Sequence, residues 1–375
     1  MKIRLNDAAA IAACALIVVF AKAADTSAEM SGSWRISNWT FHSDRVQLEL
    51  TRSTLTSRWV ESRDYALDDL HGLSPDQLRS LHSSVRFEIV KDAGAFLCEG
   101  SVTAGVGGGT FQFEPSKAFA TEMRRLGFGD LSPNTMFSMA VNNVDLVFVR
   151  AVQKAGLRNI SASNLISLRG YGVSPEYIAD VKAMGYDYTA DDLVHLKSYG
   201  VPTDLLRGLK KQGYDLTSDE VIKLRNYGVT SDYVRGIAAS GQRFSVDEIV
   251  KLKSYGVQPE FVQDFKSAGY NLPPNELIDL HNQGVTPGYA RDLKRAGYDF
   301  EPRDLIHLRQ NGVSPDFPNQ LHAAGYQRLS TQDIVKMWQN GVRGDYIARL
   351  QSAFGVGARN LSPDQIIKLK VNGVD

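Results

Sequence analysis

The sequence predicts an α+β fold: an N-terminal antiparallel β domain, then a right-angled or curved α-solenoid of about eight two-helix repeats of 28 residues. Two observations lead to this fold class. Apolar and polar residues alternate in several segments between residue 31 and about residue 115, which is typical of strands with one buried face. Beyond them, glycine recurs every 28 residues over most of the chain, and a fixed period of this length indicates a repeat array.

Three segments are expected in the 375 residues: a signal peptide (1–23), an antiparallel β domain with short helices (24–130) and an α-helical repeat array (131–375). Lys2 and Arg4 precede an apolar run at 8–20, and Ala21 and Ala23 supply the small residues of a cleavage site. The run is short for a membrane-spanning helix. We therefore expect a periplasmic or secreted protein without stable membrane insertion after cleavage, although a retained anchor stays an alternative.

The β domain is predicted from alternation at residues 46–50, 85–89 and 110–114. A short helix is expected from Pro75, capped by Ser74, and another from Ser116. The glycine-rich residues 105–109 predict a hairpin. They do not predict a phosphate-binding loop, because no Lys-Ser/Thr pair follows them and a strand comes next.

Each repeat is expected to contain two short helices that end at glycines. The first helix begins with a capping box such as Thr217 with Glu220. A helix that ends in a residue with positive φ favours glycine there, so we predict that the first glycine of each repeat is a helix cap. These cap glycines are Gly172, Gly200, Gly228, Gly256, Gly284 and Gly312. Asn143 stands at the equivalent position of a divergent first repeat.

A basic residue recurs three positions before the cap glycine, and an acidic residue recurs four positions after it. The repeat with His281 at the basic position also lacks the acid and has Gly288 there. This joint loss predicts structural ion pairs that join the two helices of one repeat: Arg225 with Asp232, Lys197 with Asp204, and Lys253 with Glu260. The alternative is that each cation extends towards the last carbonyls of its helix.

Tyrosine stands directly before the cap glycine in four successive repeats. These residues, here called the tyrosine ladder, are Tyr171, Tyr199, Tyr227 and Tyr255. The same position then holds Gln283, Asn311, Asn340 and Asn372. One interpretation is packing at the rim of the core. The other is a partner-binding surface, because solenoids commonly bind along repeated positions.

Composition and motifs argue against several classes of function. The chain has 42 basic and 42 acidic residues, whereas a nucleic-acid-binding domain usually carries a basic excess. The sequence contains no H-E-x-x-H or G-x-S-x-G motif, and its histidines lack metal-ligand spacing. We therefore expect no enzyme activity, cofactor or metal.

Cys98 lies between apolar residues and is expected to be a buried thiol.

Part of the sequence is similar to a known arrangement. The likeness lies in two segments and in one repeated motif. They are residues 92–96 (Asp-Ala-Gly-Ala-Phe), residues 107–115 (Gly-Gly-Gly-Thr-Phe-Gln-Phe-Glu-Pro) and the repeated Leu-Arg-x-Tyr-Gly-Val. They resemble the extracytoplasmic C-terminal region of BlaR/MecR-type membrane metallopeptidases of Gram-negative soil bacteria, over nearly all of residues 31–375. The chain has no H-E-x-x-H zinc-peptidase motif. The resemblance therefore implies a sensing or protein-contact appendage without peptidase activity.

The resulting expectation is a non-enzymatic, extracytoplasmic interaction or sensing module whose partner is a protein or peptide of the cell envelope. A DNA-binding helical-repeat protein is one alternative, but the neutral charge and the constant Gly-Val loop argue against it. An enzyme with a site in the β domain, around Glu99 and the glycine hairpin, is the other.

Overall fold

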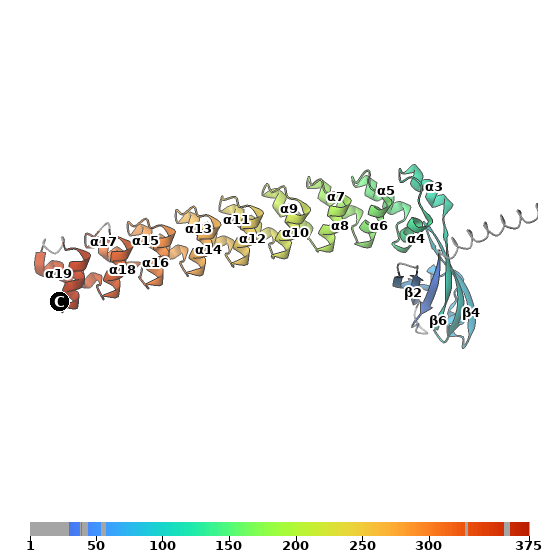
Figure 1. Cartoon of the computed structure of the whole chain (residues 1–375), viewed down its shortest axis with the longest axis horizontal. Coiled ribbons are helices and arrows are strands. Elements are labelled where there is room, and N and C mark those ends of the chain that lie inside the picture. Colours follow the sequence, from blue (N-terminus) through green and yellow to red (C-terminus); the bar gives the residue numbers. More distant parts are fainter. Residues whose placement is uncertain are drawn as a thin grey trace, which may run out of the picture. The chain divides into compact units, whose positions relative to one another are not determined.

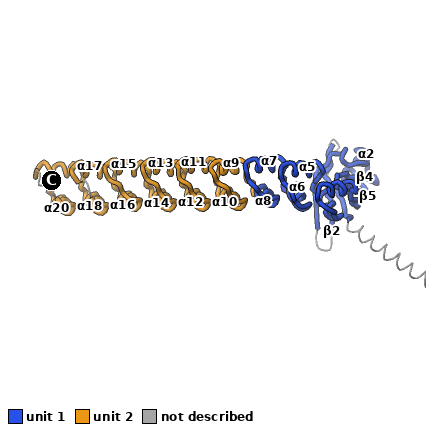
Figure 2. Tube along the Cα trace, turned by 90° about the horizontal axis from the view of Figure 1, so that it is seen from above, with its two compact units in different colours: residues 1–198 blue, residues 199–375 orange. Residues whose placement is uncertain are grey.

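The structure is a computed structural model that describes residues 30–37, 39, 44–53, 58–326, 329–355 and 361–374. The predicted signal peptide, residues 1–23, lies outside the described residues. The chain divides into two compact units, of which unit 1 ends at Ser198 and unit 2 begins at Tyr199 (Figure 2). This division falls within the repeat array, whereas the sequence placed the change of structure at residue 130.

Unit 1 contains a six-stranded antiparallel sheet with the strand order β3-β2-β1-β6-β5-β4. The strands are β1 (Ser31–Ile36), β2 (Arg45–Ser53), β3 (Arg58–Ala66), β4 (Ser83–Lys91), β5 (Gly94–Thr103) and β6 (Val106–Pro115). A 3-10 turn η1 (Leu67–Asp69) and the short helix α2 (Pro75–Arg79) connect β3 to β4. The alternation at 46–50, 85–89 and 110–114 falls in β2, β4 and β6, so the predicted antiparallel β domain is confirmed.

Two strand glycines of the sheet make room for a buried tryptophan. A Cβ on Gly100 would lie 2.7 Å from Cζ2 of Trp34, and a Cβ on Gly109 would lie 2.0 Å from the carbonyl oxygen of Glu99. The Trp34 indole nitrogen donates to that carbonyl at 3.1 Å. The hairpin turn itself is at Ala104 and Gly105, which both have positive φ. The remaining glycines therefore belong to β6 and act in packing, as close backbone approach requires.

The first helix of the array covers the apolar face of the sheet. Phe137 of α4 (Pro133–Val141) contacts Trp59, Phe96 and Phe113, with ring centroids 5.3–5.7 Å apart. The sheet also curls, because Nζ of Lys91 on edge strand β4 lies 5.4 Å from the ring of Tyr65 on the opposite edge strand β3. The first repeat is thus part of the same core as the sheet, which is why unit 1 extends beyond residue 130.

Helices follow the sheet along the described chain to residue 371 (Figure 1). Those of unit 1 are α3 (Lys117–Arg125), α4, α5 (Leu146–Lys154), α6 (Ala162–Gly170), α7 (Pro175–Ala183) and α8 (Ala190–Ser198). Those of unit 2 are α9 (Thr203–Lys211), α10 (Ser218–Asn226), α11 (Ser231–Ala239), α12 (Val246–Ser254), α13 (Pro259–Ser267), α14 (Pro274–Asn282), α15 (Pro287–Arg295), α16 (Pro302–Gln310), α17 (Asp316–Ala323), α18 (Thr331–Gln339), α19 (Gly344–Phe354) and α20 (Pro363–Val371). The predicted α+β fold with a helical repeat array is confirmed.

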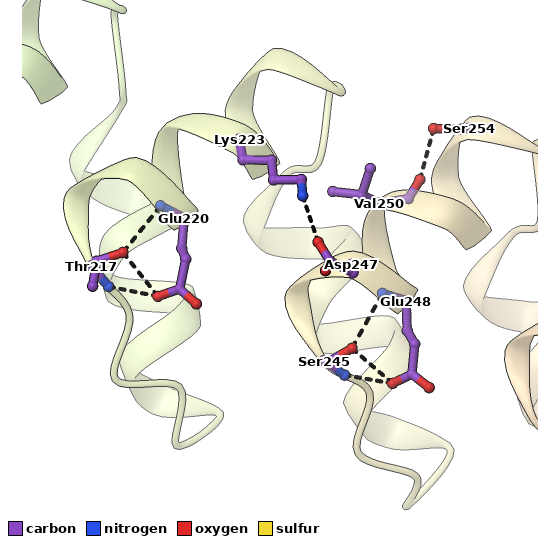
Figure 3. Close-up of polar contacts among 8 residues, drawn as sticks. All are labelled: Thr217, Glu220, Lys223, Ser245, Asp247, Glu248, Val250 and Ser254. Atoms are coloured by element: carbon purple, nitrogen blue, oxygen red, sulfur yellow. Dashed lines mark hydrogen bonds and ion pairs between the residues drawn. The ribbon is translucent and has the colours of Figure 1, made fainter.

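The caps explain why each helix is short. Thr217 and Glu220 form a reciprocal capping box at the start of α10, and Ser245 with Glu248 repeats it at α12 (Figure 3). At the other end, the Gly228 N–H donates to the Arg225 carbonyl and the Val229 N–H donates to the Leu224 carbonyl, both at 3.0 Å. This is the Schellman arrangement. The six cap glycines have φ between 63° and 75°, and Asn143 has φ of 52°.

In unit 2 the odd-numbered helices α9 to α17 form one row and the even-numbered helices form a second row (Figure 2). Successive helices of a row are in contact, as α9 is with α11 and α10 with α12. Glycine permits the closest of these contacts. A Cβ on Gly208 would lie 2.8 Å from Cβ of Ser231, and one on Gly236 would lie 2.6 Å from Cβ of Pro259. Within the described residues, no helix is both long and apolar enough to span a membrane.

Candidate interaction surface

Two of the three predicted ion pairs within a repeat, Arg225 with Asp232 and Lys253 with Glu260, are wrong. Asp232 pairs with Arg235 of its own helix at 2.8 Å. Among the described residues, no ion pair joins Arg225 to Asp232 or Lys253 to Glu260. The third predicted pair, Lys197 with Asp204, spans the division between the two units, and Lys197 itself lies over the ring of Tyr177 within unit 1.

The cations instead contact the preceding repeat. Nζ of Lys253 lies 4.7 Å from the centroid of the Tyr233 ring, and the guanidinium of Arg309 lies 5.8 Å from that of Tyr289. Arg309 also donates through Nε to the Gly284 carbonyl at 3.1 Å, and Arg225 donates to the Gly200 carbonyl at 3.4 Å. A cation above an aromatic ring is attracted by the π-electrons of its face. Each cation therefore stabilises the stacking of repeats rather than the pairing of helices within one repeat.

The repeat with His281 and a later repeat with Trp338 at the basic position obey this stacking pattern. His281 lies edge-to-face on Phe261 with ring centroids 5.4 Å apart, and Trp338 lies on Phe317 at 5.3 Å. In these two repeats an aromatic side chain stands in place of the cation above a phenylalanine ring, whereas in unit 1 the guanidinium of Arg169 lies 4.8 Å from the centroid of the Phe148 ring. The presence of His281 at the basic position is explained by this contact to the preceding repeat, whereas nothing in the structure explains Gly288.

The same buried rings carry a second contact between repeats. The hydroxyl of Tyr233 donates to the Val257 carbonyl at 2.8 Å, and the hydroxyl of Tyr289 donates to the Val313 carbonyl at 3.0 Å. Each accepting carbonyl belongs to the residue after the next cap glycine. Burial raises the pKa of Tyr289 to about 12 and raises the pKa of Tyr233 further. These tyrosines are therefore neutral structural groups that position the cap loops.

The tyrosine ladder differs from these buried tyrosines in its exposure. In unit 2, Tyr199, Tyr227 and Tyr255 are 51–53% exposed, and in unit 1 Tyr171 is 57% exposed. By contrast, Tyr214 and Tyr298 directly follow Gly213 and Gly297, the glycines that end the second helix of a repeat. These two tyrosines are 7% and 5% exposed. The residue before a cap glycine is the C-cap residue of its helix, whereas the residue after the glycine provides the hydrophobic contact of the Schellman motif. Rim packing therefore accounts for only the buried half of each ladder side chain.

Where the tyrosines stop, amide side chains bond to one another along the same edge. Nε2 of Gln310 donates to Oε1 of Gln283, and Nε2 of Gln339 donates to Oδ1 of Asn311, both at 2.8 Å. The donor stands one residue before the next ladder position. In the repeats with Tyr227 and Tyr255, the residue directly before the tyrosine has a shorter side chain, Asn226 or Ser254. The polarity change along the ladder is thus a change from an exposed aromatic surface to a surface whose polar groups satisfy each other.

The polar groups around the tyrosines of unit 2 are mostly paired with the chain itself. Lys223 contacts Asp247 at 2.5 Å, and the hydroxyl of Ser254 donates to the Val250 carbonyl at 2.8 Å (Figure 3). Across the described part of the chain, no hydrogen-bond partner faces the hydroxyl of Tyr199, Tyr227 or Tyr255. In unit 2 the ladder thus presents aromatic faces and unpartnered hydroxyls, and the ammonium group of Lys223 interacts electrostatically with Tyr227.

The β domain offers a less suitable site. Glu99, the centre of the alternative enzyme site, forms an exposed cross-strand ion pair with Arg86 at 2.6 Å. Glu61 is half-buried, and burial raises the pKa of its carboxyl. Its Oε1 lies 2.7 Å from Nη2 of Arg63, in ion-pair range but without hydrogen-bond geometry. Within the described residues, Glu61 interacts electrostatically with Arg63, Lys91 and Tyr65.

The remaining reactive side chains are potential metal ligands and the thiol of Cys98. The described residues contain no group of three or more histidine, cysteine, aspartate or glutamate side chains that could hold a metal ion. Cys98 is fully buried with a free thiol, and burial raises the pKa of that thiol to about 12. A neutral thiol of this kind is a poor nucleophile.

The chain was also compared with known proteins. No protein-family model and no curated protein matches the sequence of this chain.

Proposed function

We propose that the protein is a non-enzymatic interaction or sensing module that binds a protein or peptide along the part of the tyrosine ladder that lies in unit 2, Tyr199, Tyr227 and Tyr255. One observation carries this proposal. Tyr199, Tyr227 and Tyr255 occupy one helix-cap position in successive repeats and remain half-exposed, while the tyrosines of the neighbouring cap positions are buried. A residue kept aromatic at an exposed position, over three repeats of one unit, is better explained by contact with a partner than by stability.

The ladder has the physical properties of a recognition surface. Tyrosine offers a large contact area at a low cost in conformational entropy, and its hydroxyl adds one hydrogen bond. Tyr227 and Tyr255 precede the Schellman caps of α10 and α12, and these two helices are in contact. Their spacing is therefore set before a partner binds, which lowers the entropic cost of binding. Repeat arrays present such repeated positions as an extended binding surface.

The proposed location is the periplasm or the cell exterior, so the partner would be a component of the cell envelope. This part of the proposal rests on residues 1–23, with a charged start, an apolar run and small residues at 21 and 23. It agrees with the resemblance to the extracytoplasmic region of BlaR/MecR-type proteins. No cofactor is required for binding of this kind.

The test is a selection of displayed random peptides on the whole chain. We expect peptides that are enriched on the wild-type protein and lost on the double variant Tyr199→Ser/Tyr227→Ser. The matched control is Gln283→Ser/Asn311→Ser, which changes the same cap position in the amide part and should keep the enrichment. Equal enrichment on all three proteins, or none on any, contradicts the proposal. Circular dichroism of each variant establishes that its fold is intact.

A further inference from the structure

We infer that a cavity in unit 1 binds a small carboxylate that carries an apolar group. The cavity has a volume of about 470 Å³ and lies between the loop that follows α3 and the end of α5. A cavity of this size is typical of sites for small ligands. Its lining combines the apolar side chains of Leu126, Phe128 and Ile160 with the cationic side chains of Lys154 and Arg158, and no lining residue is acidic. The cavity shares no residue with the tyrosine ladder, so it is a second site, independent of the proposed binding surface.

Arg158 stands at a position that normally holds the partner of a lysine. It lies two residues after the glycine that ends the second helix of its repeat. In four later repeats this position holds an acid or an amide, and each accepts from a lysine near the end of the preceding helix. The pairs are Lys182 with Asp187 at 2.6 Å, Lys266 with Asn271 at 2.7 Å, Lys294 with Asp299 at 3.0 Å, and Lys210 with Asp215. Arg158 therefore places a positive charge where other repeats have an acceptor.

One later repeat also has an arginine at this position, and its contacts show how the chain can satisfy such a cation. Arg243 donates to the Gly213 carbonyl of the preceding loop at 2.8 Å. Its guanidinium also lies 5.1 Å from the centroid of the Tyr214 ring. Both contacts are made to the loop of the preceding repeat, which is the side on which the cavity of unit 1 lies.

Arg158 makes neither contact. In its repeat, Gln153 already donates to the Leu126 carbonyl of the preceding loop at 3.0 Å. Within the described part of the chain, neither Arg158 nor Lys154 has an ion-pair or hydrogen-bond partner. Both side chains are exposed. The cavity is therefore lined by two positive charges that the chain itself does not neutralise.

The loop that contains Arg158 also differs in its backbone. Ser161, the N-cap of the next helix, follows Gly156 by five positions, whereas Thr217 follows Gly213 by four. Asn159 in this longer loop has a φ of 56°, which is uncommon for a residue other than glycine. The repeat with two unpaired cations thus has a loop of its own geometry, as ligand-binding loops often do.

A carboxylate with an apolar group matches this lining. A guanidinium such as that of Arg158 can donate two parallel hydrogen bonds to one carboxylate, and the ammonium of Lys154 adds a second positive charge. The acids of the neighbouring segment, Glu122 and Asp130, are already paired with arginines. An apolar group on the ligand would remove apolar surface from water, because three apolar residues of the lining are only half-buried: Leu126, Phe128 and Ile160.

The experiment titrates N-acetyl-leucine against the whole chain and follows saturation-transfer difference NMR. We expect saturable binding, and no saturable binding of the neutral N-acetyl-leucinamide. Arg158→Asp installs the residue that later repeats carry, so the fold should persist, and binding should weaken by at least about tenfold. Arg158→Lys keeps the charge without the planar fork and should bind between the two.

Lys154→Gln should also weaken binding. Its matched control is Lys211→Gln, because Lys211 is an exposed lysine two residues before the glycine of a later repeat, as Lys154 is in its own repeat. The control should bind like the wild type. Circular dichroism of each variant establishes that its fold is intact, and Lys154→Gln decides the question if Arg158→Asp does not fold.

The tripeptide acetyl-Gly-Gly-Leu distinguishes two sources of the carboxylate. Tighter binding of the tripeptide than of N-acetyl-leucine assigns the site to the C-terminus of a polypeptide, and equal binding assigns it to a free small carboxylate. Three results overturn the inference: no saturable binding of either carboxylate, equal binding of the neutral amide, or binding that neither Arg158→Asp nor Lys154→Gln weakens. None of them affects the peptide selection on the tyrosine ladder, so the proposed function is tested separately.

Discussion

The contact between Lys253 and Tyr233 provides a direct test of how the repeats are held together. We predict that Lys253→Met and Tyr233→Leu are energetically coupled. Methionine retains the apolar stem of lysine and removes its charge. Leucine already stands at the equivalent position of the preceding repeat as the buried Leu205, so the substitution introduces a residue that this environment accommodates.

The expected magnitude follows from the geometry. Nζ of Lys253 lies 4.7 Å from the ring centroid and the lysine is partly exposed, which corresponds to about 0.5–1 kcal/mol for a cation–π contact. Tyr233→Leu alone also removes the hydrogen bond to the Val257 carbonyl, which adds about 0.5–1.5 kcal/mol. That second effect is independent of Lys253, so it cancels in the coupling energy.

The assay is urea unfolding of the four proteins of the double-mutant cycle, followed by circular dichroism at the helix band. Lys253→Met with Glu260→Gln is the control cycle. We expect coupling of about 0.5–1 kcal/mol in the first cycle and additivity within about 0.3–0.5 kcal/mol in the control. Additivity for Lys253 with Tyr233, together with clear coupling of Lys253 to Glu260, would refute the stacking explanation and restore the ion pair within one repeat.

Three further predictions concern caps, tyrosine ionisation and the thiol. Gly228→Ala should destabilise the protein by about 1–2 kcal/mol, because the φ of Gly228 is 71° and this backbone conformation is strained for alanine. No neighbour lies within 4 Å of the added Cβ, so backbone strain is the only cause of the loss. An unchanged urea midpoint would contradict this prediction. Burial raises the pKa of Tyr289 and Tyr298 from 10.0 to about 12, so the stability they contribute is fully present below pH 10 and is lost as the pH rises through 12. The difference in tyrosinate absorbance between the wild type and the variants Tyr289→Phe and Tyr298→Phe isolates these two residues, and a difference that titrates near pH 10 in the folded protein would contradict the prediction. Cys98 should resist a thiol reagent until urea unfolds the sheet, and rapid labelling of the native protein would show that its burial is wrong.

Much of the fold was predictable because local signals specify it. The capping box at Thr217, the cap glycine at Gly228 and the alternation in β2 are each decided within a few residues. The exposure of Tyr227 at a helix-cap position follows from the same local geometry. The cap glycine recurs every 28 residues from Gly172 to Gly312, so the period strengthens its assignment.

Contacts between repeats were not predictable in this way. Lys253 was assigned to Glu260, seven residues away, although its contact is with Tyr233, twenty residues earlier in the preceding repeat. A pattern within one repeat cannot show which repeat a side chain faces. A signal did exist: a buried aromatic residue precedes most cation positions by about twenty residues, and His281 follows Phe261 at the same distance. Likewise, no local pattern shows that Phe137 packs on the sheet and joins the first repeat to unit 1.

Site-specific photo-crosslinking tests the central claim most directly. A benzoylphenylalanine placed at Tyr227 in cells that produce the protein should yield a discrete crosslinked adduct. The same group at Asn311, at the equivalent cap position of the amide part, should yield none. Adducts of equal yield at both positions, or an adduct at Asn311 alone, would contradict the assignment of the tyrosine ladder as the binding surface.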